Sequence, residues 1–489
     1  MTERQANNLL DPALHKDSCG FGLIANLDDL PSHWVVATAI EALARLTHRG
    51  AVAADGKTGD GCGLLIKFPE TFLRAVGKDL GFTLAKRFAA GTVFLSRDQA
   101  RGDAGRAMIT QAIGELGLEV AGWREVPVDA SACGEQALAT LPKIEQVFVN
   151  SPDYMPRGSF NRKLFLARRR AEKRISDDET YVASLSSGTI SYKGMIMPTA
   201  LPVFYPDLRD PRMESSVCVF HQRFSTNTLP QWKLAQPFRF LAHNGEINTV
   251  QGNRNWAVAR SKNFVSEKLD DISDLDPIVS MSGSDSSSLD NMLEVLRAGG
   301  MDVLQAMRIL IPPAWQPVGD IDPDVRAFYE FWDGQQEPWD GPAGIVLSDG
   351  HYAACCLDRN GLRPARYVIT KDRHITIASE VGVYDYDEHD VVKKGRLGPG
   401  EMLAVDLVNG VVLDTDDIHD ILKSRAPYKK WLKRVVRYLD SLHIDSRMAA
   451  EPFDAETLAT YQKMFNLSRE ELNEVVAVLA KAEAEPVGS

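Results

Sequence analysis

The sequence predicts an α+β fold built mainly on antiparallel sheets, and three stretches support this prediction. Residues 19–66 alternate two apolar runs of strand type with one amphipathic helical segment. Residues 341–415 contain three successive pairs of apolar segments, each pair joined by a short polar turn, which is the pattern of β-hairpins. After about residue 420 the sequence changes to charged, helix-forming segments. Hairpins mixed with separate helices are typical of α+β domains.

The individual elements follow from periodicity. In the first part of the chain we expect strands over residues 19–27, 62–68, 91–95 and 146–150, and helices over residues 34–46 and 162–175. Residues 216–223 form a continuous apolar run of strand type that enters a polar loop. Near the end, Ser468 and Glu471 form a capping box that predicts the start of a helix. One face of this helix would carry Leu472, Val475, Val476 and Leu479.

Composition excludes several classes of protein. The 489 residues are 44% apolar and 25% charged. These fractions are ordinary for a globular protein, and no run approaches the length of apolar sequence that a membrane span needs. The net charge of −12 argues against a nucleic-acid partner. The run Arg168-Arg169-Arg170 lies beside Glu172 in a helical pattern, and we interpret it as a solvated helix face.

The cysteines and histidines give no metal-binding pattern. The six cysteines form no C-x-x-C pair, and the ten histidines form no H-E-x-x-H motif. The first eighteen residues are charged and lack the apolar core of a secretory signal. We therefore expect a reduced, cytoplasmic protein that binds no metal and no cofactor within this chain.

Cys19 begins the most informative motif. A cysteine at the start of a strand is usually a small buried apolar residue. Here, however, Cys19-Gly20-Phe21-Gly22 is followed by His48-Arg49-Gly50 and then by four further motifs. They are His221 to Asn227 (HQRFSTN), His243 to Glu246 (HNGE), Gly283 to Ser287 (GSDSS) and Asp358 to Pro364 (DRNGLRP). Together these motifs resemble the class II, N-terminal-nucleophile glutamine amidotransferases, and more closely the amidotransferase part of the NADPH-dependent glutamate synthase large (alpha) subunits of bacteria.

The resemblance implies a fold and a division of the chain. It implies the αββα four-layer sandwich of the N-terminal-nucleophile (Ntn) hydrolases over residues 19–420, a propeptide over residues 1–18, and a helical linker or the start of a central synthase domain over residues 421–489. It also implies partners: L-glutamine, the rest of the large subunit with FMN and a 3Fe-4S cluster, and a small (beta) subunit that carries FAD and uses NADPH.

The reaction that the resemblance implies is hydrolysis of glutamine to glutamate and ammonia through a γ-glutamyl thioester on Cys19. A thiol is mostly protonated at neutral pH and needs a base. An N-terminal α-amine, with an ordinary pKa of about 7.7–8.0, suits that role, but it exists at Cys19 only if residues 1–18 are removed. Asn244 and Gly245 match the family's oxyanion hole, although Asn-Gly alone is typical of a turn.

Four further residues match the family's substrate site. Arg223 is the candidate clamp for the glutamine α-carboxylate, with Thr226 adding a hydrogen bond. Asp285 is the candidate partner of the α-ammonium, although Ser284-Asp285-Ser286 also has the pattern of a helix N-cap. Arg49 matches a residue near the nucleophile. We interpret Cys62, Cys355 and Cys356 as core residues, because nothing in their sequence surroundings would activate them.

Two other interpretations stay open at this point. An amidotransferase that serves a different acceptor, such as a phosphoribosyl or sugar phosphate, would carry the same motifs. A chain that keeps its first eighteen residues would be catalytically silent and would only bind glutamine or a partner.

Overall fold

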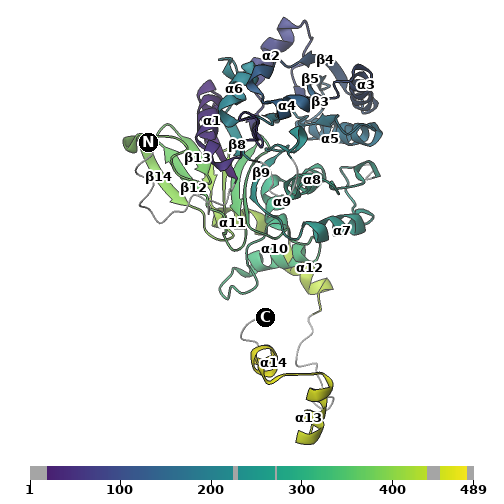
Figure 1. Cartoon of the computed structure of the whole chain (residues 1–489), viewed down its shortest axis with the longest axis vertical. Helices are drawn as coiled ribbons and strands as arrows, with labels where there is room; N and C mark the ends of the chain where they lie inside the picture. Colours follow the sequence, from purple (N-terminus) through teal and green to yellow (C-terminus); the bar gives the residue numbers. More distant parts are fainter. Residues whose placement is uncertain (1–18, 224–229, 270–272, 438–451, 482–489) are drawn as a thin grey trace. The chain divides into compact units, whose positions relative to one another are not determined.

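The structure is a computed structural model that describes residues 19–223, 230–269, 273–437 and 452–481. The chain divides into two units, Met1–Lys430 and Trp431–Ser489, and each is described by itself. The first unit contains two large antiparallel sheets and a smaller third one (Figure 1).

The first large sheet has seven strands. In spatial order they are β14 (Val391–Arg396), β12 (Arg366–Thr370), β13 (His374–Ala378), β1 (Gly20–Asn26), β8 (Val217–Gln222), β2 (Cys62–Lys67) and β7 (Thr189–Gly194). All neighbours are antiparallel. The central strands β1, β8 and β2 are buried on both faces, which explains their continuous apolar sequences.

The second large sheet has five antiparallel strands. Their order is β16 (Val411–Leu413), β15 (Met402–Asp406), β11 (Tyr352–Leu357), β10 (Ala343–Ser348) and β9 (Leu241–Gly245). An apolar core joins the two sheets: Leu23 of β1, Val219 of β8 and Ala242 of β9 lie in it with Cys355 of β11. Ile24 points the other way, into the core under helix α1. This alternation is the two-residue period of a strand.

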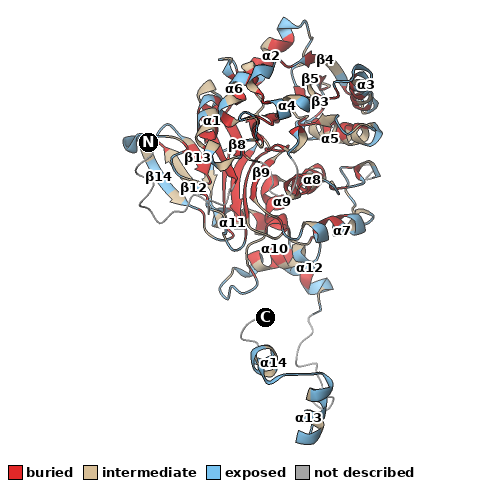
Figure 2. Cartoon of the chain, viewed as in Figure 1, coloured by how far each residue is buried: buried red, intermediate tan, exposed pale blue. Residues whose placement is uncertain are grey.

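Helices cover the outer faces and complete four layers (Figures 1 and 2). Helix α1 (His33–Arg45) begins at the N-cap Ser32 and buries its apolar side against the seven-stranded sheet. Helix α8 (Asp285–Ala298) packs against β9, and α11 (Thr415–Lys423) packs against β15. Further helices of this unit are α2 (Glu70–Asp79), α4 (Glu135–Ala139), α6 (Leu201–Phe204), α7 (Val250–Ser261), α9 (Val303–Leu310) and α10 (Pro323–Asp333). The predicted αββα sandwich is confirmed.

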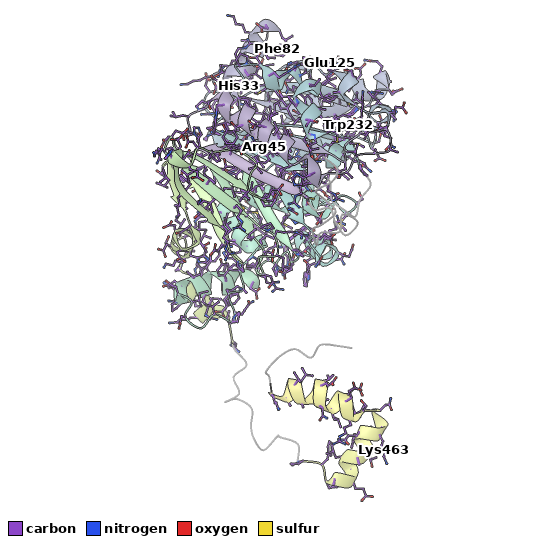
Figure 3. All side chains as sticks on the ribbon, turned by 60° about the vertical axis from the view of Figure 1, so that its left-hand side comes forward. His33, Arg45, Phe82, Glu125, Trp232 and Lys463 are labelled. Carbon is purple, nitrogen blue, oxygen red and sulfur yellow. The ribbon has the colours of Figure 1, made fainter. Side chains whose placement is uncertain are left out.

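The third sheet lies in the chain between β2 and β7 and was not expected as a separate layer. Its strands are β4 (Glu119–Glu125), β5 (Lys143–Asn150), β3 (Phe88–Leu95) and β6 (Tyr181–Val182), covered by α3 (Gln99–Glu115) and α5 (Arg157–Arg174). Trp232, labelled in Figure 3, joins this sheet to the main body: its ring packs against Phe94 and Phe204, and its Nε1 donates to the Ala137 carbonyl at 3.3 Å.

The arginine run on α5 corrects the sequence interpretation. Arg168 is not on a solvated face: it is 3% exposed and pairs with Glu172 of its own helix and Glu294 of α8 at 2.7 Å. Arg170 pairs with Asp274 at 2.6 Å. Helical periodicity could not reveal that Arg168 is buried, because the second carboxylate that pairs with it belongs to Glu294. This residue lies on another helix, 126 positions later in the chain.

The second unit begins within α12 (Tyr428–Val435) and contains α13 (Ala455–Met464), α14 (Arg469–Glu471) and α15 (Ala477–Lys481). The predicted capping box is present, since Ser468 accepts from the Glu471 amide at 3.1 Å and Glu471 accepts from the Ser468 amide at 2.9 Å. Among the described residues, no helix is long and apolar enough to cross a membrane.

We predict that Leu23→Ala lowers the free energy of unfolding by about 2–5 kcal/mol. The reason is that Leu23 is fully buried between the two large sheets. The measurement is urea unfolding followed by tryptophan fluorescence. Val392→Ala is the control, at a side chain 65% exposed on the edge strand β14. Its free energy of unfolding should stay within about 0.5 kcal/mol of the wild type. Equal losses in both variants would contradict this account of the core.

Candidate active site

Strand order brings three distant segments to one end of the seven-stranded sheet. Gly20 of β1 and Cys62 of β2 are both register partners of Gln222, the last residue of β8. Cys19, which precedes β1, therefore lies near the loop before β2 and near Arg223, which follows β8. The HQRF and Cys19 motifs are neighbours because β8 is hydrogen-bonded to β1.

Cys19 is 8% exposed, and its surroundings keep the thiol protonated. Burial raises the pKa of this thiol to about 12, Asp60 and Asp285 add to the rise, and the positive charge of Arg363 opposes it. A buried thiol among carboxylates is not a nucleophile without a base that takes its proton. The local chemistry therefore agrees with the sequence argument that Cys19 needs a separate base.

Asn244 and Gly245 end strand β9 of the other sheet. The Asn244 side chain is buried, and its Nδ2 donates to the Cys19 carbonyl at 2.7 Å. This bond uses one of the two amide hydrogens and leaves the second for another acceptor. Gly245 has φ of +140°, and a Cβ there would come within 1.7 Å of the Pro342 carbonyl oxygen. Only glycine fits in this conformation and at this distance.

Arg223 has a left-handed backbone, with φ of +83°. This conformation is uncommon in a residue that is not glycine. The Arg223 amide donates to the Gly61 carbonyl at 2.9 Å, and its Nε lies 3.4 Å from Oδ2 of Asp60. Burial raises the pKa of Asp60 to about 6, while the Ala51 amide donates to it at 3.0 Å. The arginine is thus held at the end of β8 by a partly buried carboxylate.

Asp285 is the first residue of α8, directly after the N-cap Ser284. Its Oδ2 accepts from the Ile247 amide at 2.9 Å and lies 3.8 Å from Nδ1 of His243. His243 is the residue before Asn244, and its Nδ1 also lies 2.8 Å from the Ser286 hydroxyl. Asp285 is therefore both part of the helix start and a close neighbour of the β9 end that carries Asn244.

Comparison with known proteins assigns the family. The sequence pattern of the glutamine amidotransferases class-II matches residues 19–431 and begins at Cys19. This chain belongs to the class II glutamine amidotransferases.

Similar proteins include three glutamate synthases. The chain is 40% identical to ferredoxin-dependent glutamate synthase 1, chloroplastic/mitochondrial, of Arabidopsis thaliana, over 99% of this chain and 30% of that protein. It is 39% identical to the glutamate synthase [NADPH] large chain of Azospirillum brasilense and 38% identical to that of Bacillus subtilis, in each case over 99% of this chain and 32% of the relative. This amidotransferase chain spans about a third of the length of these relatives.

Among solved structures, the chain resembles the allosteric regulatory enzyme of purine biosynthesis. The identity is 12% and the TM-score 0.38, over 81% of this chain and 48% of that one. A glutamine phosphoribosylpyrophosphate amidotransferase from B. subtilis matches with 13% identity and a TM-score of 0.30, over 72% of this chain and 48% of that one.

Arg49 of this amidotransferase binds a carboxylate of the protein itself. Its Nη2 donates to Oε2 of Glu380 at 2.5 Å, and a Cβ at Gly20 would lie 3.2 Å from its Cγ. Burial disfavours the charged form of Glu380, yet hydrogen bonding and charge from Arg49 hold the pKa of that carboxyl below its ordinary value. Arg49 thus packs beside Gly20, the residue that follows the candidate nucleophile Cys19. Thr226 lies outside the described residues, so its predicted hydrogen bond stays a prediction.

Sequence reasoning missed three residues of the site: Asp60, Arg363 and Glu380. Arg363 lies in the DRNGLRP motif, to which the family resemblance gave no individual role, and Asp60 precedes Cys62 in the segment GDGCG. Glu380 had no sequence signal, because its link to Arg49 spans 331 positions.

The three cysteines that we interpreted as core residues, Cys62, Cys355 and Cys356, are buried. Cys62 is fully buried, and its Sγ donates to the Ile196 carbonyl at 3.2 Å. Cys355 and Cys356 lie in β11 with 0% and 1% exposure. Burial raises the pKa of all three thiols.

We predict that Asp60→Asn lowers the pKa of the Cys19 thiol, because a neighbouring negative charge that opposes the thiolate is removed. Asp60 itself titrates near pH 6, so the difference from the wild type should appear above that pH. The measurement is the pH dependence of Cys19 alkylation by iodoacetamide, followed by peptide mass spectrometry, and its midpoint should fall by about one pH unit. Asp79→Asn, at a side chain 68% exposed, is the control. An unchanged midpoint in Asp60→Asn would contradict the argument.

Proposed function

We propose that this chain hydrolyses L-glutamine to glutamate and ammonia through a γ-glutamyl thioester on Cys19. The observation that carries the proposal is the Asn244 amide, which donates to the Cys19 carbonyl at 2.7 Å and so lies directly beside the proposed nucleophile. The family match that begins at Cys19 supports the same conclusion.

In the proposed mechanism, removal of residues 1–18 gives Cys19 a free α-amine. This amine takes the thiol proton, and the thiolate attacks the carboxamide carbon of glutamine. The oxyanion that forms accepts hydrogen bonds from the side-chain amide of Asn244 and the backbone N–H of Gly245. The α-amine then returns its proton to the departing ammonia, and water hydrolyses the thioester to glutamate.

The two charges of the glutamine head group need opposite partners. Arg223 and Thr226 are proposed for the α-carboxylate and Asp285 for the α-ammonium. Arg49 is proposed to support the site by its position, since it pairs with Glu380. Asp60, which lies 3.4 Å from Arg223, would keep the guanidinium oriented before substrate arrives.

We further propose that the ammonia serves the synthesis of L-glutamate from 2-oxoglutarate in a complete glutamate synthase. The identity of 40% and 39% to two glutamate synthases, over 99% of the chain, supports this assignment over a different acceptor. The remainder of the large subunit would hold FMN and a 3Fe-4S cluster, and a small subunit with FAD would deliver electrons from NADPH.

We predict that active protein begins at Cys19 and that Cys19→Ala abolishes glutamine hydrolysis while the fold survives. Intact-mass measurement of active protein tests the first part, and a mass that still includes residues 1–18 would contradict the mechanism and favour a silent binding subunit. Cys62→Ala is the matched control, since Cys62 is a buried core thiol, and its rate should stay within a few-fold of the wild type.

We predict opposite kinetic effects at the head group and at the oxyanion hole. Arg223→Lys and Asp285→Asn should raise KM about ten- to hundredfold, because a charge-assisted contact contributes roughly 1.5–3 kcal/mol to both ground and transition states. Asn244→Ala should instead lower kcat by about 10²–10³, because the oxyanion exists only after attack. The measurement is steady-state kinetics with glutamine. Asn248→Ala, in the exposed loop after β9, is the control. Near-normal KM in both head-group variants would mean that glutamine binds elsewhere.

A further inference from the structure

A cavity of about 390 Å³ lies at one edge of the seven-stranded sheet. Its lining includes residues of β12 and of the edge strand β14, the two paired strands labelled in Figure 1. Two segments line it, residues 361–366 and residues 396–399. Three of the lining residues are arginines, Arg363, Arg366 and Arg396, and none is acidic. A basic cavity of this kind attracts an anion.

The arginines are arranged unfavourably for the empty protein. Arg366 and Arg396 are direct register partners on neighbouring antiparallel strands, and like charges in that relation destabilise a sheet. In the part of the chain that the structure describes, no hydrogen bond or ion pair is made by either guanidinium, and Nε of Arg363 is buried without a hydrogen-bond partner. The nearby Glu401 carboxylate accepts from the Gly398 amide at 2.7 Å, within its own loop.

Protection of the sheet edge explains only some of the basic residues on β12, β14 and the loop before β12. Edge strands commonly carry lysine to prevent pairing with other chains, and Lys393 and Lys394 on β14 fit that role. Arg366 lies on the inner neighbour β12, and Arg363 lies in a loop before it, so neither protects the edge. Edge protection therefore does not account for the position of these two arginines.

The walls of the cavity are preformed. Asp358 is buried and accepts from the amides of Asn360 and Leu362 at 2.9 and 3.1 Å. These bonds fix the loop that carries Arg363. Gly361 has φ of +62°, and a Cβ there would come within 2.8 Å of Cα of Pro399. The two lining segments therefore touch, and only glycine allows this approach.

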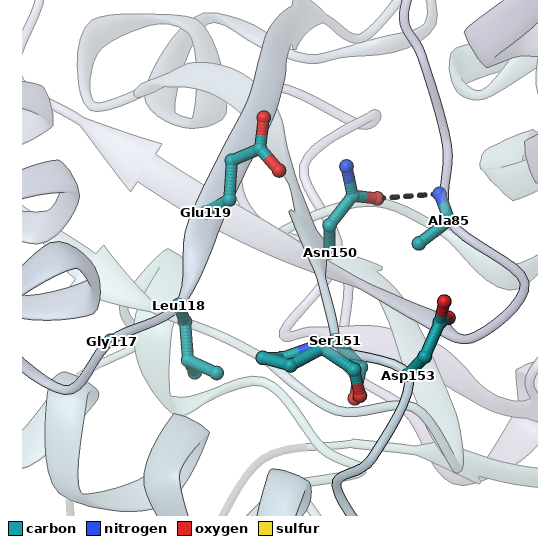
Figure 4. A pocket seen from close by; sticks show the side chains of 8 residues that line it. Ala85, Gly117, Leu118, Glu119, Asn150, Ser151 and Asp153 are labelled. Atoms are coloured by element: carbon teal, nitrogen blue, oxygen red, sulfur yellow. Dashed lines mark hydrogen bonds between the residues drawn. The ribbon is translucent and has the colours of Figure 1, made fainter.

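A second cavity of about 380 Å³ provides a contrast (Figure 4). It is lined by Glu119 and Asp153 with Asn150, whose Oδ1 accepts from the Ala85 amide at 2.8 Å, and no lysine or arginine lines it. Clustered arginines are therefore not a general property of the hollows on this protein, whose net charge is −12.

We propose that Arg366 and Arg396 bind a carboxylate group in this cavity and that Arg363 forms its inner wall. A planar guanidinium matches a carboxylate with two parallel hydrogen bonds, and two such groups side by side suit a dicarboxylate. The carboxylate belongs to a free dicarboxylate or to an acidic side chain of another polypeptide segment. The proposal does not depend on glutamine hydrolysis.

Arg363 connects this cavity to the candidate active site, because it lines the cavity and its charge lowers the pKa of the Cys19 thiol. Arg363 packs over Gly344, where a Cβ would come within 3.2 Å of the Arg363 Cβ and 2.9 Å of the Phe21 ring. Gly344 is the register partner of Asn244, the residue whose amide donates to Cys19. Arg363 therefore lines this cavity and also acts electrostatically on the Cys19 thiol, so a carboxylate bound beside it would change the charge that Cys19 experiences.

The test is calorimetric titration of the full chain with disodium succinate at constant ionic strength. We expect saturable binding that Arg366→Gln or Arg396→Gln weakens at least about tenfold. Lys393→Gln is the matched control: it removes one positive charge from β14 but on the other face of the strand, where Nζ lies 5.9 Å from the Tyr367 ring centroid. This variant should bind as the wild type does.

A tetraglutamate peptide is the second probe and separates the two sources of the carboxylate. Binding of the peptide but not of succinate, lost in the same two variants, supports an acidic polypeptide segment. Binding of succinate supports a free dicarboxylate. Absence of binding for both probes, or equal binding in all variants, would overturn the proposal. Arg366→Gln without ligand should keep or raise Tm, because it removes the like-charge pair.

Discussion

The hydrogen bond from the Asn244 amide to the Cys19 carbonyl is the contact on which the candidate site depends, because it joins the two large sheets at the ends that carry the candidate residues. Cys19 precedes a strand of one sheet, and Asn244 lies at the end of a strand of the other. His221 adds a second link, since its Nε2 donates to the His243 carbonyl at 3.1 Å. Close packing of the sheets thus brings together residues that are 225 positions apart in sequence.

The burial that this packing requires also determines the chemistry. It raises the pKa of the Cys19 thiol and lowers the pKa of His221 to about 3, so this histidine, which links the two sheets, is neutral at working pH. His221 uses its Nε2 hydrogen for a structural bond and is poorly suited to serve as the base. An α-amine on Cys19 itself would meet the need without adding another buried ionisable side chain.

Local sequence pattern predicted individual elements well, whereas the four-layer sandwich came from the family resemblance. The apolar runs of β1 and β8, the hairpins after residue 341 and the capping box at Ser468 all follow from short-range spacing. Contacts between distant segments were not predictable in this way. Arg168 looked solvated because its partner Glu294 is on another helix, and Asp60 had no assigned role until strand order brought it to Arg223. The family resemblance supplied Arg223 and Asp285, which spacing alone could not pair with a substrate.

Charges of both signs surround Cys19, and their balance affects the pKa of its thiol. Asp60 and Asp285 disfavour the thiolate, whereas Arg363 favours it. Both carboxylates have a second partner. Asp285 is proposed to bind the substrate α-ammonium, and Asp60 lies beside the Arg223 guanidinium. A glutamine head group that neutralises Asp285 would remove one obstacle to ionisation when substrate arrives. The same reasoning gives Arg363 the opposite effect, because an anion bound beside it would weaken the positive charge that favours the thiolate. Substrate and a bound carboxylate would therefore act on the nucleophile through different residues and in opposite directions.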